Sequence, residues 1–352
     1  MIRDKQTPLS KQMKDKIAKP VVKNTEEYPD GNFNKVISTG STLLDLAISG
    51  GRVRGGGLPG GIFVEIFGQS QSGKTIFLSE VAGEVQRQGG EIIYYDPEAR
   101  LDPVFAKMIG LTVNEKNHLY PDTVPEIFAP IKKWQPENSN VINGIFADSL
   151  AALSTELEMS EEGDPYGTRR AKEFSEWLRK TCRIVQDKNY LMVCSNQIRQ
   201  IIGATQYQPK TSTTGGKAMD FYPSLRLVST VTKKHKVEVK FAGKEVERIV
   251  GIRTEVEVYK SSIWKPYHKA PVSIIFDYGV DNTRESLQFI KDYSKFSVYT
   301  LGGETLDKSL NESIKIIEDD NLEHQLREEV IDLWETIEKQ FQSNRKLKYN
   351  NL

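Results

Sequence analysis

Apolar positions change their spacing several times along this chain, and the changes predict its secondary structure. From about Val36 onward, short apolar runs alternate with stretches in which apolar residues recur every three or four positions. This alternation is typical of parallel strands joined by crossover helices. We therefore expect an α/β core around a mostly parallel central sheet. The predicted strands are 62–67, 91–95, 141–147 and 191–195, and the predicted helices are 74–88, 103–109, 124–134 and 168–186.

The two ends of the chain differ from this middle part. Polar and apolar residues alternate strictly at 237–241 and 254–258, which predicts a hairpin or meander added to the sheet. Residues 282–352 are polar and rich in helical pattern, and they predict a small α+β C-terminal domain and tail. Residues 1–36 are polar and basic, without a clear apolar strand before Val36. They form either a solvated arm or a tether to a neighbouring subunit, and 37–281 is the core.

Composition narrows the class of protein only slightly. Lys+Arg and Asp+Glu are both 48, so any surface for a polyanion must be local. The two cysteines, Cys182 and Cys194, lie in apolar surroundings and suit a reducing compartment better than a disulfide framework. No apolar run approaches the ~18 residues of a membrane span. We expect a cytoplasmic protein without a membrane partner.

One segment carries a phosphate-binding pattern, G-x-x-x-x-G-K-[ST]. Its glycines let the backbone fold into a loop of inward-pointing amides, and the helix that follows adds its positive N-terminal end. The lysine would neutralise the β- and γ-phosphates of ATP, and the threonine hydroxyl would coordinate Mg²⁺. The segment follows a predicted strand and opens a predicted helix, which is the context that the pattern requires. Its residues are Gly68, Gln69, Ser70, Gln71, Ser72, Gly73, Lys74 and Thr75.

Two carboxylates are candidates for the chemistry at that loop. Asp148 follows the predicted strand 141–147, at the end that faces the ligand crevice in open α/β sheets, and is the second expected Mg²⁺ ligand. Glu98 lies just past the strand after the phosphate-loop helix, where it can reach a water beside the γ-phosphate. On position alone, Glu98 could equally be an ordinary acid of a surface loop.

Together with the phosphate loop, several further segments resemble one family. The segments 37–41, 56–61, 95–99, 148–153, 195–199 and 213–218 read ISTGS, GGLPGG, YDPEA, DSLAAL, SNQIR and TTGGKA. In this order and spacing they resemble bacterial RecA and its phage-encoded relatives, including the UvsX type. The resemblance begins at Ile37 and fades after about Tyr278. It implies a RecA-type P-loop ATPase core.

The resemblance assigns roles at the nucleotide. Glu98 is similar to the catalytic glutamate of the family. Asp102 and Phe105 correspond to a nucleotide-binding segment whose aromatic residue stacks on adenine. Gln197 resembles the glutamine that senses the γ-phosphate and reports it to a DNA-binding loop. Lys260 matches the first of two lysines that contact the ATP of the neighbouring subunit.

The resemblance also implies two DNA-binding loops. The first spans 198–214, a polar stretch with little apolar periodicity, and is followed by two glycines. The second spans 161–167 and leads into a helix that opens with two arginines. Cations suit phosphates, and Ile or Tyr can wedge between or stack on bases. The expected DNA-binding residues are Tyr166, Arg169, Arg170, Arg199, Ile202, Tyr207, Lys210, Thr213, Gly215 and Gly216.

The chain also departs from the family pattern. Ser262 stands where the second lysine would be, and Asp220 replaces a basic residue near the coupling element, whereas Phe221 resembles the residue that contacts the neighbouring subunit. The chain ends in a basic segment from Arg345 to Lys348 instead of an acidic tail. These departures put the rate and cooperativity of hydrolysis in question. They hint at a phage-encoded protein, which would act in the host cytoplasm.

We expect an ATP-dependent recombinase with DNA-stimulated hydrolysis. It would form a helical homo-oligomeric filament on single-stranded DNA, pair that strand with homologous double-stranded DNA, and exchange strands. A hexameric RecA-fold helicase and a non-hydrolysing ATP-binding regulator are the alternatives. Helicases of this fold usually carry an arginine finger and appended DNA-handling domains, and a non-hydrolysing regulator has no need of intact Lys74, Thr75, Glu98 and Asp148 together.

Overall fold

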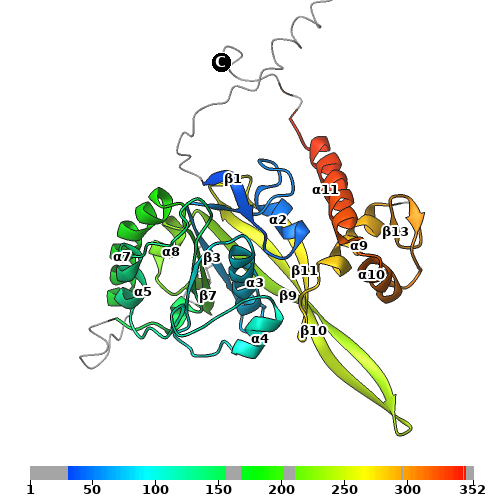
Figure 1. Cartoon of the computed structure of the whole chain (residues 1–352), viewed down its shortest axis with the longest axis horizontal. Coiled ribbons are helices and arrows are strands. Elements are labelled where there is room, and N and C mark those ends of the chain that lie inside the picture. Colours follow the sequence, from blue (N-terminus) through cyan, green and yellow to red (C-terminus); the bar gives the residue numbers. More distant parts are fainter. Residues whose placement is uncertain (1–30, 156–167, 201–210, 295, 344, 346–352) are drawn as a thin grey trace, which may run out of the picture.

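The computed structural model describes residues 31–155, 168–200, 211–294, 296–343 and 345. Within these ranges the side chains at 168, 169, 199, 200, 211 and 212 are not described. The described chain forms a large sheet with helices on both faces, a projecting hairpin and a small C-terminal module (Figure 1).

The main sheet is parallel on one side and antiparallel on the other. Neighbouring strands are parallel from β9 through β3, β7, β6 and β4 to β5, and antiparallel from β9 through β10 and β11 to β12. This confirms both the mostly parallel core and the antiparallel meander. In spatial order the strands are β12 (Gly279–Val280), β11 (Lys269–Ile275), β10 (Lys244–Ser261), β9 (Leu225–Phe241), β3 (Ile62–Gly68), β7 (Leu191–Gln200), β6 (Gly144–Ala147), β4 (Ile92–Tyr95) and β5 (His118–Leu119).

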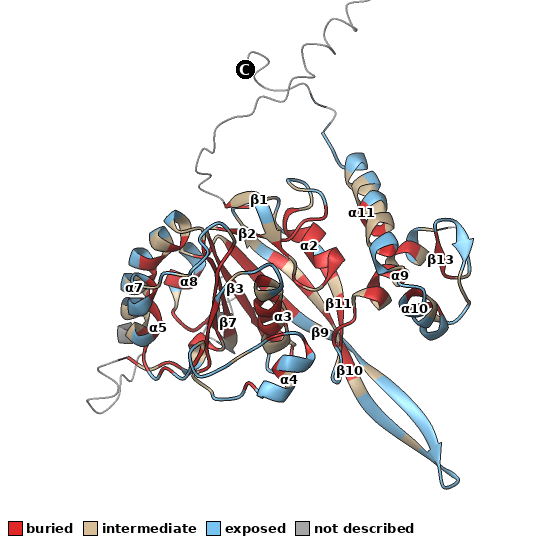
Figure 2. Cartoon of the chain, viewed as in Figure 1, coloured by how far each residue is buried: buried red, intermediate tan, exposed pale blue. Residues whose placement is uncertain are grey.

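Strand β3 lies in the middle of this sheet and is covered on both faces. All seven of its residues are buried. Alternate side chains enter two separate cores: Val64 belongs to the same buried cluster as Phe77 of α3, and Phe63 belongs to the same cluster as Phe174 of α7. A strand with helices on both faces needs a continuous apolar run instead of an alternating one. Figure 2 shows the buried strands between exposed outer helix faces.

The helices agree with the predicted ones except near their ends. The predicted helix 124–134 ends at Ile131, and the strand predicted at 191–195 continues to Gln200. The periodic pattern missed the short helix α2, which is buried along its whole length. The helices of the core are α2 (Thr42–Ser49), α3 (Lys74–Arg87), α4 (Pro103–Met108), α5 (Val124–Ile131), α7 (Thr168–Asp187) and α8 (Lys217–Phe221).

A strand begins before Val36, where the sequence has no clear apolar strand. Strand β1 (Asn32–Ile37) pairs antiparallel with β2 (Leu58–Gly60), and Ile37 lies opposite Leu58. The sequence of β1 is mainly polar because only Ile37 at its end is buried in the core. Backbone hydrogen bonds to β2 stabilise this strand, and such bonds leave no apolar pattern in the side chains.

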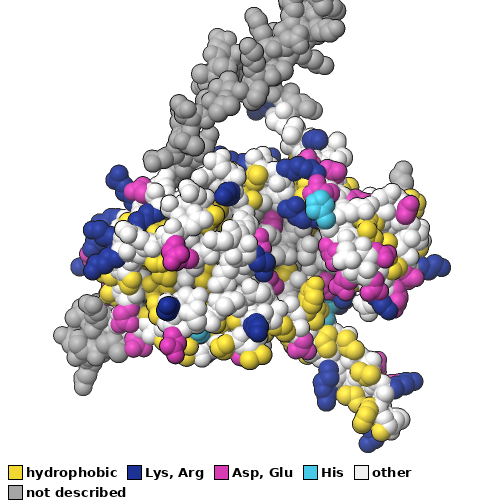
Figure 3. Space-filling model, viewed as in Figure 1, with side chains coloured by type: hydrophobic (Ala, Val, Ile, Leu, Met, Phe, Trp, Pro, Cys, Tyr) yellow, Lys and Arg dark blue, Asp and Glu magenta, His cyan; other side chains and the backbone are white. Residues whose placement is uncertain are grey.

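Strands β9 and β10 continue beyond the sheet as a long two-stranded hairpin. Its turn contains Ala242 and Gly243, both with positive φ (48° and 77°), as two-residue hairpin turns require. Val237, Val239 and Phe241 are exposed there, among lysines and an arginine (Figure 3). The bases of the same two strands form one wall of the main cavity.

The C-terminal module packs beside the antiparallel side of the sheet (Figure 1). Its last helix contacts α2, and the indole of Trp334 lies 5.6 Å from that of Trp264, which follows β10. Its elements are α9 (Asn282–Tyr293), β13 (Thr300–Leu301), β14 (Glu304–Thr305), α10 (Leu310–Asp319) and α11 (Glu323–Gln340). Across the described ranges, no helix combines the length and the apolar character needed to span a membrane.

Candidate nucleotide site

The phosphate loop connects β3 to α3, as its sequence predicts. Gly73 precedes the helix with φ +86°, and a Cβ atom there would lie 2.3 Å from Cδ1 of Ile274. A Cβ at Gly68 would lie 2.3 Å from the carbonyl oxygen of Ser229. Glycine is needed at Gly68 because a side chain would collide with the backbone of β9, and it is favoured at Gly73 because of the positive φ. The N-terminus of α3 therefore opens directly into the loop, where its free amides favour an anion.

The side chain of Lys74 folds back onto the backbone of the phosphate loop. Its Nζ donates to the carbonyl oxygens of Gly68 (3.2 Å) and Gln69 (2.6 Å), and its side chain is buried. Burial lowers the pKa of Lys74, while the negative charges of Asp148 and Glu98 oppose that shift. An ammonium group so placed can neutralise phosphate oxygens bound by the loop.

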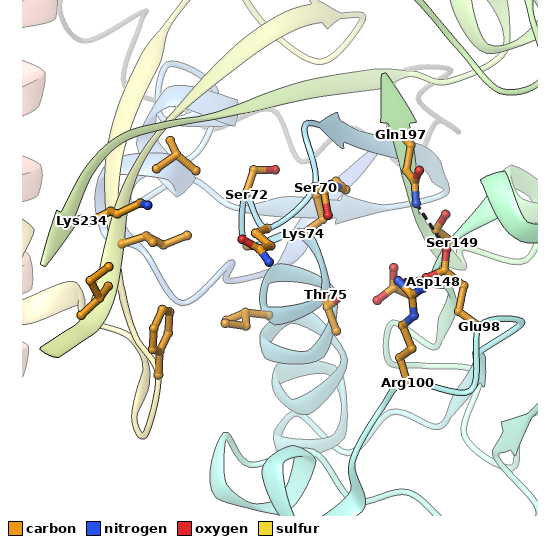
Figure 4. Close-up of a pocket in the computed structure, with 17 residues that line it drawn as sticks. Ser70, Ser72, Lys74, Thr75, Glu98, Arg100, Asp148, Ser149, Gln197 and Lys234 are labelled. Atoms are coloured by element: carbon orange, nitrogen blue, oxygen red, sulfur yellow. Dashed lines mark hydrogen bonds and ion pairs between the residues drawn. The ribbon is translucent and has the colours of Figure 1, made fainter. Parts of the chain in front are cut away.

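A cavity of about 700 Å³ opens beside this loop (Figure 4). That volume lies within the range of small-molecule sites, roughly 300–1,000 Å³. One wall is polar and carries the loop residues, Glu98, Asp148 and Gln197. The opposite wall comes from the hairpin base and β11, and consists of Val231, Lys234, Ile249, Ile252 and Phe276. The polar wall suits a triphosphate, and the second wall, which is apolar except for Lys234, suits an aromatic base.

Thr75 and Asp148 are the candidate Mg²⁺ ligands. Asp148 directly follows β6, accepts a hydrogen bond from Oγ of Ser195 on β7, and interacts with the Thr75 hydroxyl. Burial raises the pKa of Asp148, which a bound cation would reverse. Among the described residues there is no group of three or more His, Cys, Asp or Glu side chains able to hold a metal. One carboxylate and one hydroxyl fit Mg²⁺, which takes its remaining ligands from phosphates and water.

Glu98 and Gln197 meet at the same edge of the sheet. The Nε2 atom of Gln197 donates to Oε1 of Glu98 over 3.4 Å, and Arg100 pairs with the other carboxylate oxygen of Glu98 at 2.5 Å. Gln197 lies opposite Gly68 in the parallel register of β7 and β3. The predicted catalytic carboxylate and the predicted phosphate sensor therefore both line the cavity, next to the phosphate loop.

The predicted adenine contacts lie elsewhere. Asp102 caps α4 by accepting from the amide of Val104, and Phe105 is half-buried on that helix. Neither is among the described residues that line the cavity, whereas the ring of Phe276, 44% exposed, is. No local sequence pattern indicated Phe276, because it follows β11, and only strand pairing in the antiparallel meander brings that strand to the cavity.

The predicted DNA-binding residues are only partly described. Tyr166, Ile202, Tyr207 and Lys210 lie outside the described residues, as do the side chains of Arg169 and Arg199. Arg170 lies in the first turn of α7. Thr213 ends strand β8 (Thr211–Thr213), which pairs antiparallel with β7, and Ile198 lies opposite Thr213. Gly215 and Gly216 follow with positive φ (93° and 57°). Strand β7 continues three residues beyond Gln197 to Gln200, and β8, where the described chain resumes, pairs with that end of β7.

Lys260 lies away from the cavity of its own chain. Its Nζ donates to the carbonyl oxygens of Asp220 and Phe221, at 2.8 Å each, at the end of α8. Burial lowers its pKa. Phe221 is 73% exposed beside it.

The fold and the cavity define a P-loop nucleotide-binding protein with a parallel sheet. The family model described as the RecA N-terminal domain matches residues 10–281. The chain is 33% identical over 296 residues to protein RecA of Borrelia duttonii (strain Ly), covering 83% of this chain and 78% of that protein. Protein RecA of Colwellia psychrerythraea is 35% identical over 257 residues (72% and 69%), and that of Marinobacter nauticus 36% over 254 residues (71% and 68%). The chain belongs to the RecA family of recombinases.

Proposed function

We propose that this protein is an ATP-dependent recombinase with DNA-stimulated ATP hydrolysis. It forms a helical filament on single-stranded DNA, pairs that strand with a homologous duplex, and exchanges strands. The observation that carries this proposal is the position of Gln197. Its amide contacts Glu98 at the nucleotide cavity, and β7, which carries it, pairs with β8 within the predicted DNA-binding loop 198–214. One strand end thus joins the nucleotide to the predicted DNA-binding segment.

Each of the cavity residues has a separate role in ATP binding and hydrolysis. The amides of the phosphate loop and Lys74 bind the triphosphate. Thr75 and Asp148 would hold Mg²⁺, which would supply positive charge beside the phosphate oxygens. Glu98 orients and deprotonates the attacking water. Phe276, from the opposite wall, is placed to contact the base. Gln197 hydrogen-bonds to the γ-phosphate, so that ATP and ADP favour different positions of the strand that carries it.

Other residues contact DNA and the neighbouring protomer. The DNA contacts are the loop residues predicted above, with Arg170 at the N-terminal end of α7, where backbone amides also favour phosphate. Phe221 contacts the neighbouring protomer, and Lys260 reaches the ATP of that neighbour. Because a filament places ATP between protomers, nucleotide binding favours the extended state that grips DNA, and hydrolysis releases it.

The test is ATP hydrolysis with and without single-stranded DNA, combined with electron microscopy using a slowly hydrolysed ATP analogue. We expect strong stimulation of hydrolysis and open helical filaments. Lys74→Ala should abolish both because the nucleotide is no longer bound productively. Closed rings would indicate a hexameric motor, and nucleotide binding without hydrolysis would indicate a regulator; either result would contradict the proposal.

A further inference from the structure

A buried ion pair joins β3, the strand that leads into the phosphate loop, to the neighbouring strand β9. Glu65 of β3 and Arg226 of β9 are neighbours in the parallel register, and their Nε–Oε2 distance is 2.6 Å. Glu65 is fully buried and Arg226 is 4% exposed. Neither residue lines the nucleotide cavity. Buried ion pairs are often no more stabilising than apolar residues of the same volume, so stability alone does not account for this pair.

On one side, the pair is linked to the nucleotide sensor through Asn196. The Nδ2 atom of Asn196 donates to Oε1 of Glu65 and to the carbonyl oxygen of Thr214, both at 2.9 Å. Its Oδ1 accepts from the amide of Gln197 at 2.9 Å. Asn196 is itself fully buried. It therefore fixes the backbone of Gln197 and, through Thr214, the far end of the predicted DNA-binding segment.

On the other side, Arg226 reaches α8, which carries Phe221, the residue proposed to contact another protomer. Its guanidinium donates to the carboxylate of Asp220 on α8 at 2.5 Å and to Oγ1 of Thr213 at 3.4 Å. The rings of Phe67 and Tyr259 lie 4.7 and 5.5 Å from its central carbon. These rings hold the planar group in one orientation. Lys260 binds the carbonyl oxygens at the end of the same helix.

We propose that Glu65, Arg226 and Asn196 are positioning residues that couple the nucleotide cavity to the DNA-binding segment and to α8. The inference rests on the proposed function and names the residues that transmit its nucleotide dependence. A displacement of Gln197 moves Asn196, which bonds to both Thr214 and Glu65, and Glu65 in turn holds the guanidinium that anchors Thr213 and Asp220. Because the interior is close-packed and of low dielectric, these bonds shift together between discrete arrangements instead of stretching singly.

The first test replaces the ion pair by apolar side chains of similar length, Glu65→Met with Arg226→Met. Such a replacement preserves the fold where the pair serves only stability. The readout is the ratio of single-stranded DNA affinities measured with a slowly hydrolysed ATP analogue and with ADP. Allosteric coupling typically gives a factor of about 5 to 150. We expect the ratio to fall toward one in the double variant, with the affinity for the analogue within about twofold of the wild type, since neither residue contacts the nucleotide.

A matched control pair is Arg253 and Glu285, which bond at 2.8 and 2.9 Å between β10 and α9, away from Gln197. Arg253→Met with Glu285→Met should change the unfolding temperature without changing the affinity ratio. Asn196→Ser provides a milder second variant that leaves the ion pair intact and removes both amide donations. It should also lower the ratio, and combining it with the Met pair should lower it no further, because both act on one network.

The outcomes are distinguishable. If the folded Met pair variant, or Asn196→Ser where the Met pair fails to fold, keeps the wild-type ratio, the three residues are only structural and the inference is wrong. If the wild-type protein itself shows no nucleotide-dependent affinity for single-stranded DNA, the proposed function fails before the positioning residues are tested. If the control variant with Arg253→Met and Glu285→Met also shows a lower ratio of DNA affinities, the effect comes from general destabilisation, and the inference is overturned.

Discussion

The side-chain amide of Gln197 lies 3.4 Å from a carboxylate oxygen of Glu98, although 98 residues separate them in the chain. Gln197 belongs to β7, and Glu98 follows β4. Strand β6 lies between these two strands, and Asp148 directly follows it. Three of the predicted site residues, from three adjacent parallel strands, therefore meet at one edge of the sheet, where the phosphate loop also begins.

Gln197→Ala should separate nucleotide binding from the response to DNA. The substitution removes the amide that contacts Glu98 and leaves the phosphate loop and Asp148 in place. We expect the ATP analogue still to bind, while stimulation of hydrolysis by single-stranded DNA falls roughly 10-fold or more. Steady-state ATPase assays across a DNA titration measure this. Retention of full stimulation would contradict a sensing role for Gln197.

Glu98→Gln should lower the turnover rate with little change in KM. The amide keeps the size and hydrogen bonding of the side chain but cannot accept a proton from water. Loss of a general base costs about 10²- to 10⁴-fold in rate. Glu126→Gln is a control, because that side chain caps α5 through Asp122 and Thr123 and lies outside the cavity. A Glu98→Gln enzyme with wild-type turnover would show that Glu98 is an ordinary loop acid.

Phe276→Ala and Phe105→Ala decide which ring contacts adenine. Phe276 lines the cavity and Phe105 does not, so the first substitution should weaken binding of a fluorescent ATP analogue and the second should not. An aromatic contact contributes about 0.5–1.5 kcal/mol beyond its buried area, which corresponds to a loss of roughly 2- to 10-fold. A larger loss from Phe105→Ala would instead support the role that the family resemblance implies.

Asp45 should make the protein less stable as pH rises. It is buried in α2, accepts bonds from Ser38 and Thr39, and burial raises its pKa from 3.8 to about 6. The folded state therefore holds a proton that the unfolded state releases, and the free energy of unfolding falls between about pH 4 and pH 6. The two pKa values correspond to a change on the order of 3 kcal/mol.

Denaturant titrations of the wild type and Asp45→Asn measure this effect. The difference in the free energy of unfolding between the two proteins should shrink by that amount as the pH rises through the interval. Other buried acids, such as Glu80, whose pKa is also raised by burial, titrate in both proteins and cancel in the difference. A difference that stays constant with pH would contradict the assigned pKa.

The sequence alone determined the features that depend on local geometry. The phosphate loop from Gly68 to Thr75 could be predicted because its chemistry needs two glycines, a lysine and a hydroxyl at fixed spacing between a strand and a helix. The alternation of strands and helices predicted the parallel core, because crossover connections give each element its own apolar period. Asp148 was identified as a site residue by its place at the end of an apolar strand.

Only the tertiary structure decided which distant residues meet. Phe276 enters the cavity because β11 pairs with β10, and no local pattern encodes that pairing. Strand β1 was missed because its stability comes from backbone bonds to β2, which leave no apolar alternation in its side chains. The bond between Glu65 and Arg226 depends on the parallel register of β3 and β9, whose paired residues lie 161 positions apart. Spacing along a chain specifies what one segment can do, whereas contacts between strands are set by how the whole sheet packs.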